Sequence, residues 1–304
     1  MKTKRRIVDA LIYVLLSILS LIWISPIVWL VLQSLSGDLG ATARSKLVPD
    51  SFSFKNYVYL LTNKVERFSP TVNDYVVEDS IFNYRSWIGN TLMIAAITAL
   101  ISTILVLSVS FAFSRLRFKG RQGMMKVILS LGMFPGFLSM ILLYQLFKLF
   151  NPDQTLTGSL VSLIVCYAGG AGMGYYISKG FFDTISKSID EAAMLDGATR
   201  LQIFFKITIP LAKPIIVYTV LTSFMGPWAD YILSSYILHG TEVTAQGGWT
   251  VAIGLFQMLD QTRANDYFNQ FCAGSVIIGI PITALFIVMQ RFYVGGVTGG
   301  AVKG

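Results

Sequence analysis

Six long apolar stretches constrain this chain more than any other feature of its sequence. They run over 10–36, 86–114, 127–145, 154–178, 214–238 and 267–290, and Asp230 in the fifth is the one charged residue within them. A helix needs about 20 apolar residues to cross the hydrocarbon core of a bilayer. We therefore expect an all-α integral membrane protein with six transmembrane helices.

The composition supports a membrane protein. Only 13% of the residues are charged and 54% are hydrophobic, whereas a soluble domain carries about 25% charged residues. The net charge of +8 does not indicate nucleic-acid binding, because no basic patch stands apart from apolar sequence. It is better explained as a signal of membrane topology.

The first stretch follows four basic residues, as the apolar core of a signal peptide does. It is much longer than the about 7–15 residues of such a core, and no clear cleavage site follows it. We predict a retained anchor helix.

Basic residues predict the orientation. Six spans place both termini on one side, and if that side is cytoplasmic the inner segments hold 16 of the 24 Lys and Arg residues, as the positive-inside rule requires. We expect an N-terminal region over residues 1–85, with an anchor helix and a polar extracytoplasmic segment, and then a core 86–291 with five spans. A cytoplasmic tail 292–304 follows.

The inner segment 179–213 is too long for a simple turn and is expected to be helical. Ser188 is a suitable N-cap, and Glu191 three residues later completes a capping box. Gly197 can take a positive φ and ends this helix. A second helix from Ala198 breaks at Pro210 and Pro214, before the fifth span. Its apolar residues are expected on the membrane side: Leu201, Phe204, Phe205, Ile207 and Ile209.

The expected helix–bend–helix suits two different roles. A compact knob of this kind can enter a groove on a partner protein. An amphipathic helix of similar composition can also lie on the lipid surface without binding any protein. The physical pattern alone leaves both roles open.

The spacing of fixed residues in this segment resembles the signature loop of binding-protein-dependent ABC importer permeases. Glu191-Ala192-Ala193 is followed after three residues by Gly197, and after nine more by Ile207 and Pro210; Ile209 stands where leucine is usual. The C-terminal run 290–304, the run 250–255 and the run 227–231 are similar to the maltose-type permeases of this family. The resemblance covers the chain from about residue 86 to 304.

This resemblance implies roles for named residues. The loop couples to an ATPase through Glu191, Ala192, Ala193, Asp196, Gly197, Ile207 and Pro210. The tail residues Gly299, Gly300 and Lys303 contact the same partner, and Gly247, Gly248 and Trp249 in an outer loop contact a solute-binding protein. It implies a multi-pass protein of a prokaryotic cell membrane that works with two ATPase subunits and a second, different permease subunit. ATP and Mg bind to the ATPase, and this chain holds no cofactor.

The cargo implied by the resemblance is a carbohydrate, with an oligosaccharide as the first expectation. The same importer mechanism with a polyamine or glycerol phosphate is the alternative. The glycine run 169–174 is no phosphate loop, since it lacks the Gly-Lys-Ser/Thr element. A membrane-embedded enzyme would need clustered catalytic groups, and a secondary transporter would be expected to show paired inverted halves; the sequence indicates neither.

A few polar residues lie in or beside the apolar stretches. Asp230 is expected near the outer interface, where it either caps a helix or contacts substrate. Cys166 and Cys272 are expected to fill the core, and His239 has no partner in the sequence for a metal site. The sequence assigns no residue to substrate binding.

Overall fold

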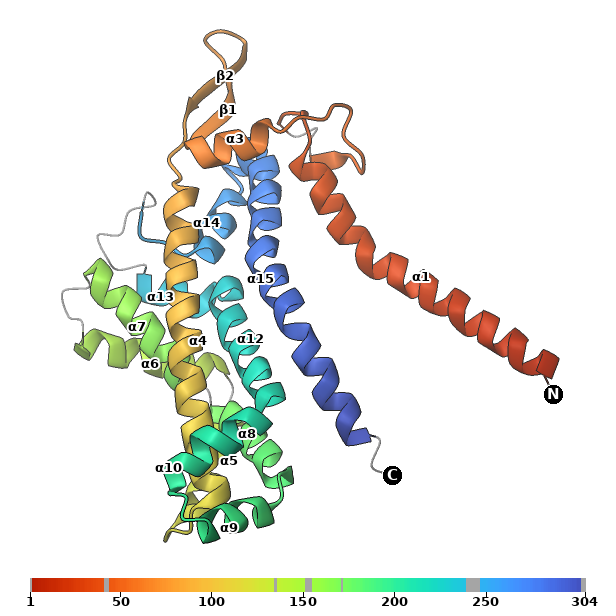
Figure 1. Cartoon of the computed structure of the whole chain (residues 1–304). Helices are drawn as coiled ribbons and strands as arrows, with labels where there is room; N and C mark the ends of the chain where they lie inside the picture. Colours follow the sequence, from red (N-terminus) through yellow and green to blue (C-terminus); the bar gives the residue numbers. More distant parts are fainter. Residues whose placement is uncertain are drawn as a thin grey trace. The chain divides into compact units, whose positions relative to one another are not determined.

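The computed structural model describes residues 2–40, 44–133, 136–150, 155–170, 172–238 and 247–301. The chain forms two compact units (Figure 1). Unit 1 comprises Met1–Arg85 and Gly254–Ile280, and unit 2 comprises Ser86–Ile253 and Pro281–Gly304.

Most of the chain is helical, as expected. Among the described residues, four helical stretches are long and apolar enough to cross a membrane: Val8–Ser34, Tyr84–Arg115, Leu156–Thr184 and Ala264–Gln290. They belong to α1 (Lys2–Ser34), α4 (Tyr84–Arg115), α7 (Leu156–Gly169) with α8 (Gly172–Thr184), and α15 (Ala264–Ala301).

The described residues of the third expected span lie in α5 (Arg121–Gly132) and α6 (Gly136–Phe150). Among them, Leu138–Phe150 is an apolar helix shorter than a full span. Pro135, expected inside this span, lies outside the described residues.

The fifth expected span is broken. α12 (Lys213–Ala229) ends at Asp230, and α13 (Ile232–Leu238) follows. At the start of this span, the helical segment Arg200–Leu211 and α12 meet at an angle of 80°. Counting this bent pair as one span gives up to five candidate spans in the described chain, so the six-span topology stays a prediction.

The polar segment of unit 1 contains a β-hairpin that the sequence analysis did not predict, within a chain whose described residues are mostly helical. It contains α3 (Lys55–Thr62) and an antiparallel hairpin of β1 (Lys64–Ser69) and β2 (Asp74–Asp79). The register pairs Lys64 with Asp79 and Ser69 with Asp74. Asn73, with φ of 52°, supplies the left-handed residue near the tip, which asparagine tolerates better than most residues.

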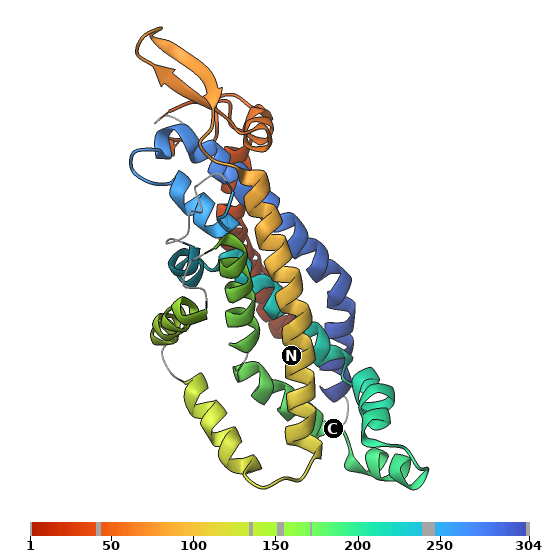
Figure 2. The ribbon, with the colours of Figure 1, turned by 90° about the vertical axis from the view of Figure 1, so that its left-hand side faces the viewer.

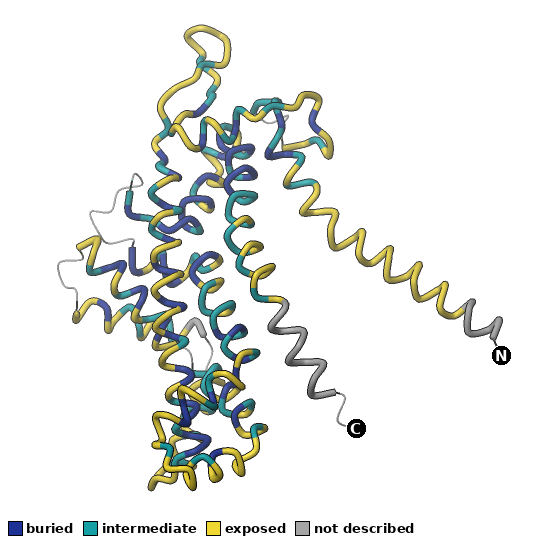
Figure 3. Tube along the Cα trace, viewed as in Figure 1, coloured by how far each residue is buried: buried dark blue, intermediate teal, exposed yellow. Residues whose placement is uncertain are grey.

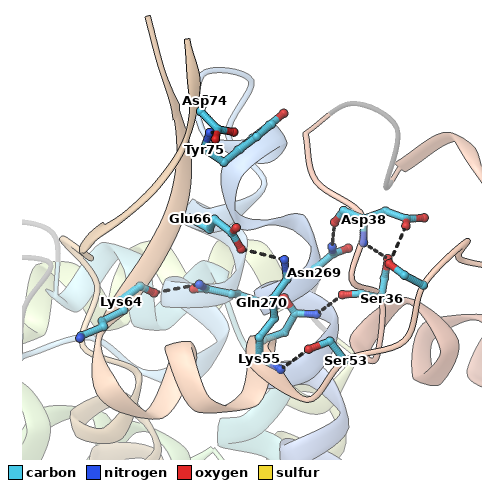
Figure 4. A network of polar contacts seen from close by, with 12 residues as sticks. Ser36, Asp38, Ser53, Lys55, Lys64, Glu66, Asp74, Tyr75, Asn269 and Gln270 are labelled. Atoms are coloured by element: carbon cyan, nitrogen blue, oxygen red, sulfur yellow. Dashed lines mark hydrogen bonds and ion pairs between the residues drawn. The ribbon is translucent and has the colours of Figure 1, made fainter. Parts of the chain in front are cut away.

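An isolated two-stranded hairpin is only marginally stable in water, and this one is held at its base by side chains from elsewhere in unit 1. Gln270 Nε2 donates to the Lys64 carbonyl at 2.8 Å, and Lys55 Nζ lies 2.7 Å from Glu66 Oε2 (Figure 4). Arg67 Nε pairs with Asp266 Oδ2 at 2.8 Å, which raises the pKa of the arginine. The base is therefore fixed to α15, while β2 is mostly exposed.

A second group of hydrogen bonds orders the chain that precedes α3. Asn56 is buried and donates to the carbonyls of Ser34 and Ser36, at 3.1 and 2.7 Å. Asn269 Nδ2 donates to the Asp38 carbonyl at 2.8 Å (Figure 4). By contrast, the apolar window of α1 is 0% buried within the described chain (Figure 3).

Unit 2 is built around α4. One apolar cluster joins Ile94 of α4 to residues of α6, α7 and α13, with Leu163 and Ile237 fully buried. A second cluster lies toward the C-terminal end of α4, where Phe111 packs with Phe182 of α8 and Ile215 of α12. The second cluster also includes Phe204 and Ile209, and so supports the segment 187–211 that contains the predicted coupling residues.

Candidate functional site

The first helix of the candidate coupling segment is α9 (Lys187–Leu195). Its N-cap is Ser186, whose hydroxyl accepts from the Ser188 amide, so the predicted capping box of Ser188 and Glu191 is wrong. The helix begins two residues earlier because Ser186 takes the capping role, and the Ser186 and Ser188 hydroxyls lie 2.7 Å apart. Glu191 is exposed.

Gly197 ends α9 and forms the expected bend. Its φ is +84°, a region that L residues other than glycine enter at a cost. The Ala198 amide donates to the Ala193 carbonyl at 2.9 Å, and the Gly197 amide donates to the Met194 carbonyl at 3.1 Å. These two bonds are the Schellman arrangement that closes a helix C-terminus.

The second leg begins with a capping box that was not predicted from the sequence. Thr199 Oγ1 accepts from the Gln202 amide, and Gln202 Oε1 accepts from the Thr199 amide at 2.7 Å. The Thr-x-x-Gln spacing was the available signal. The leg then runs through α10 (Arg200–Ile203), a π-helical turn η1 (Phe204–Thr208) and α11 (Ile209–Leu211).

The bent segment exposes large apolar side chains on both legs. Leu195 beside the bend is 90% exposed, and Leu201 and Phe205 are 69% and 64% exposed. Phe204 is buried, whereas Ile207 and Ile209 are half-buried. The apolar residues of the second leg therefore do not share one environment.

The predicted coupling residues lie at one end of unit 2, beside the C-terminal end of α4 (Figures 1 and 2). Ala192 and Asp196 are exposed like Glu191, and Ala193 is half-buried. Pro210 is exposed in the first turn of α11. In the whole of α9 the one buried residue is Asp190.

A groove of about 660 Å³ lies within unit 2. Its walls come from α4, α6, α7, α8, α12 and α13, and they contain both hydroxyl-bearing and apolar side chains. The hydroxyl groups belong to Thr98, Ser139, Tyr167, Tyr218, Thr219, Thr222 and Ser223. Gly170 and Gly174 of the expected glycine run also line the groove.

Asp230 lines the groove but its carboxylate is already used. Oδ1 accepts from the Leu233 amide at 3.1 Å, at the start of α13, and Oδ2 accepts from the Tyr167 hydroxyl at 2.7 Å. The carboxylate therefore caps α13 and ties it to α7, which matches the structural role considered for it. Cys166 lies in the same wall, and Cys272 is buried in unit 1.

The outer-loop residues lie against α4. Asn90 Nδ2 donates to the carbonyls of Gly247 and Trp249, at 2.8 and 3.1 Å. The rings of Trp87 and Trp249 are 5.9 Å apart. Gly248 is buried there, and His239 lies outside the described residues. In the tail, Gly299 and Gly300 lie in the helical backbone of α15, and Lys303 lies outside the described residues.

The comparison with protein families gives one match that covers most of unit 2. Residues 104–295 match the family described as "Binding-protein-dependent transport system inner membrane component". This match spans more than half of the chain and includes the whole coupling segment.

Several curated relatives are similar over nearly the full length. The galactooligosaccharides transport system permease protein GanQ of Bacillus subtilis is 32% identical, over 100% of this chain and 99% of the relative. The maltose/maltodextrin transport system permease protein MalG of Vibrio vulnificus is 34% identical, over 90% of both chains. The maltodextrin transport system permease protein MalD of Streptococcus pneumoniae is 30% identical, over 100% of this chain and 98% of the relative.

Solved structures share the fold. A bacterial ABC transporter involved in the import of the acidic polysaccharide alginate matches with a TM-score of 0.69 and 22% identity, over 95% of this chain and 97% of that chain. The alginate transporter in complex with its alginate pentasaccharide-bound periplasmic protein matches with a TM-score of 0.63 and 15% identity, over 95% of both chains. The family match over residues 104–295 and the full-length relatives establish that the chain belongs to the family of inner membrane components of binding-protein-dependent transport systems.

Proposed function

We propose that this chain is a permease subunit of an ATP-driven importer that moves a carbohydrate delivered by an extracytoplasmic binding protein. The observation that carries the proposal is the bent segment 187–211, which combines an ordered glycine turn with exposed apolar and acidic side chains. A membrane subunit without an ATP site of its own needs such a surface to receive energy from a partner ATPase.

The chemistry of the segment supports docking on a protein rather than resting on lipid. Glu191 is exposed on α9 and Asp196 is exposed at its C-cap, and Leu195 lies exposed beside Asp196. Burying two carboxylates in the apolar part of a bilayer is costly, whereas a protein groove can pair them with donors while it covers the leucine. Ala192 and Ala193 keep α9 narrow enough to enter such a groove.

The full topology belongs to the proposal as well. Six spans with both termini in the cytoplasm place the coupling segment where ATP is found. The interruption of the fifth span between α12 and α13 fits this topology, because helices interrupted in the membrane are tolerated where other helices cover their ends. α1 offers its apolar surface to lipid or to a second permease subunit.

The groove supports a neutral polar cargo. Its volume of about 660 Å³ lies within the range of about 300–1,000 Å³ for small-molecule sites. Sugars present hydroxyl edges and apolar faces, and the groove wall offers both kinds of contact. The relatives named above are permeases for maltodextrins and galactooligosaccharides, which supports an oligosaccharide.

The same wall argues against the charged alternatives. Among the described lining residues no Lys or Arg is present to bind a phosphate group. The one carboxylate among the described lining residues, Asp230, already accepts hydrogen bonds from Tyr167 and the α13 backbone, and a single carboxylate cannot balance the several ammonium groups of a polyamine. Glycerol phosphate and polyamines are therefore the weaker candidates.

The proposed partners are two ATPase subunits, a second permease subunit and a solute-binding protein. In the related alginate system a periplasmic protein is bound to the transporter, which supports the last of these. We propose that Gly247, Gly248 and Trp249 contribute to that contact, and that Gly299, Gly300 and Lys303 reach the ATPase.

The test of energy coupling is Glu191→Lys in the reconstituted complex. Glu78→Lys is the matched control, since it makes the same charge change at an exposed position on β2. Glu191→Lys is expected to keep the subunit in the membrane and to abolish ATP hydrolysis stimulated by the loaded binding protein. Normal stimulation in Glu191→Lys would overturn the docking role of this segment.

The test of cargo is a competition assay, which measures uptake by the complex reconstituted in vesicles. Unlabelled maltodextrin and galactooligosaccharide are expected to reduce uptake driven by the cognate binding protein, and spermidine and glycerol 3-phosphate are not. Competition by either charged compound alone would transfer the proposal to that cargo class.

A further inference from the structure

Two consecutive residues join the C-terminal end of α4 to the end of α8, to the turn that follows it and to the start of α9. Ser114 Oγ donates to Asp183 Oδ1 at 2.7 Å. Arg115 Nη2 donates to the Ile185 carbonyl at 2.9 Å, and Arg115 Nε lies 2.9 Å from Asp190 Oδ2. The last turn of a membrane-spanning helix is therefore bound to the first turn of the coupling helix.

The Arg115–Asp190 contact is almost completely shielded from water. The two side chains are 2% and 8% exposed. Arg115 Nη1 and Asp190 Oδ1 are buried, and within the described chain they have no hydrogen-bond partner. Nε and Oδ2 are at ion-pair distance without the alignment of a hydrogen bond.

A pair of this kind is a weak source of stability, because desolvation of two buried charges offsets much of their attraction. Its charges nevertheless suit both helices. Arg115 is the basic residue in the last turn of α4, and Asp190 is the acid in the first turn of α9. Each charge thus complements the dipole of its own helix, and the pair fixes which ends meet.

The second leg is attached to α4 independently. Phe204 of η1 packs on Phe111 of α4, with ring centroids 4.9 Å apart. Phe111 precedes Arg115 by four residues, which is about 6 Å along the helix axis. The two legs of the bent segment are therefore held at two successive points on α4, so that a rotation or translation of the segment acts on this helix directly.

We propose that the Arg115–Asp190 pair is a positioning contact that makes α9 and α4 move as one body when a partner displaces the coupling segment. The inference rests on the proposed docking of 187–211 on an ATPase. Without the pair, α9 can still dock, but its displacement is taken up at the α8–α9 turn and is not passed to the span. The pair thus determines the efficiency with which hydrolysis drives transport.

The test is the double variant Arg115→Met with Asp190→Leu. Replacing both charges by apolar groups leaves no buried charge unpaired, and such replacements are often tolerated in folded proteins. The variant is expected to lower cargo imported per ATP hydrolysed by about fivefold or more, the lower end of typical coupling between sites. Lys46→Met with Asp50→Leu is the matched control, because it removes an exposed ion pair in unit 1.

A spectroscopic measurement separates positioning from general destabilisation. Spin labels at Arg117→Cys and Lys187→Cys, both exposed in the parent chain, are placed in a background that lacks Cys166 and Cys272. With the pair intact, the distance between the labels is expected to stay constant when ATP is added to the complex. In the double variant it is expected to change or broaden.

A second variant covers the case in which the apolar pair does not fold. Arg115→Cys with Asp190→Cys is expected to be uncoupled when reduced, and to regain import per ATP after reaction with a short bismaleimide crosslinker. Equal import per ATP before and after crosslinking overturns the proposal.

The outcomes separate this inference from the proposed function. Loss of uptake in Glu191→Lys together with normal import per ATP in the apolar double variant overturns the positioning role alone. Normal uptake in Glu191→Lys overturns the docking role and, with it, the inference drawn from it. Loss in both, with the Lys46–Asp50 control unaffected, supports both.

Discussion

Replacing Gly197 by alanine isolates the contribution of the bend to coupling. A Cβ at this position would meet no atom within 4 Å, so the substitution brings no steric overlap. The penalty comes from the backbone alone, because φ is +84° and an L residue pays roughly 1–2 kcal/mol in the left-handed region. Both hydrogen bonds of the turn can still form, since alanine keeps its amide.

This penalty sets the size of the expected effect. If it falls entirely on the bent conformation that docks, the apparent affinity for the ATPase decreases about 5- to 30-fold, since about 1.4 kcal/mol corresponds to a factor of ten. The assay is the titration of purified ATPase against reconstituted permease, read as ATP hydrolysis stimulated by the loaded binding protein. Gly197→Asn is expected to lose less than Gly197→Ala, because asparagine enters the left-handed region more readily.

Gly120 provides a closely matched control. Its φ is +85°, and a Cβ there would also meet nothing within 4 Å. It is the N-cap of α5, outside the coupling segment, so Gly120→Ala carries the same backbone penalty without touching the knob. Equal titrations for Gly197→Ala and wild type, or an equal loss in Gly120→Ala, would refute the reasoning.

Three further predictions concern the groove and unit 1. Gly226→Trp is expected to fill the groove and reduce uptake while stimulated hydrolysis persists. Gly89→Trp, at an equally open site on α4 outside the groove, is its control. Equal uptake in the two variants would contradict the role of the groove as the cargo pathway. Asn56→Ala is expected to destabilise unit 1 by about 1–3 kcal/mol, because it frees two carbonyls; a melting temperature equal to that of Thr71→Ala would exclude this. The Asp50 amide lowers the pKa of Asp38 below its ordinary value, so the stability that the Asp38 carboxylate contributes is present above that ordinary value and is lost as the pH falls through the lowered value. Protease protection of 44–51 is expected to decrease there in wild type but not in Asp38→Asn, and identical profiles would contradict it.

The sequence predicted the features that depend on local chemistry. Gly197 was identifiable as a bend because few other residues tolerate its φ, and Pro210 and Pro214 indicated the break that appears as an 80° bend before α12. The long apolar runs likewise predicted the helices of four candidate spans. These features are properties of neighbouring residues, so a single sequence contains them.

The features that the sequence missed depend on contacts between distant segments. The hairpin 64–79 is stabilised by Gln270 and Asp266, and the Arg67–Asp266 pair joins residues 199 positions apart. The Arg115–Asp190 pair connects two helices in the same way, and nothing in either local sequence indicates the partner. The sequence analysis did not identify Ser186 as the N-cap, because Ser186 and Ser188 are both suitable capping residues. Only the observed start of α9 at Lys187 distinguishes them.

The account depends most on contact between the coupling segment and an ATPase, and photo-crosslinking tests that contact directly. Ala192→Cys, exposed on α9, is labelled with benzophenone maleimide in the reconstituted complex after Cys166 and Cys272 are replaced by serine. Thr71→Cys near the tip of the hairpin is labelled as the control. The account predicts a covalent adduct between position 192 and the ATPase subunit and none from position 71; no adduct from position 192, or equal adducts from both, would contradict it.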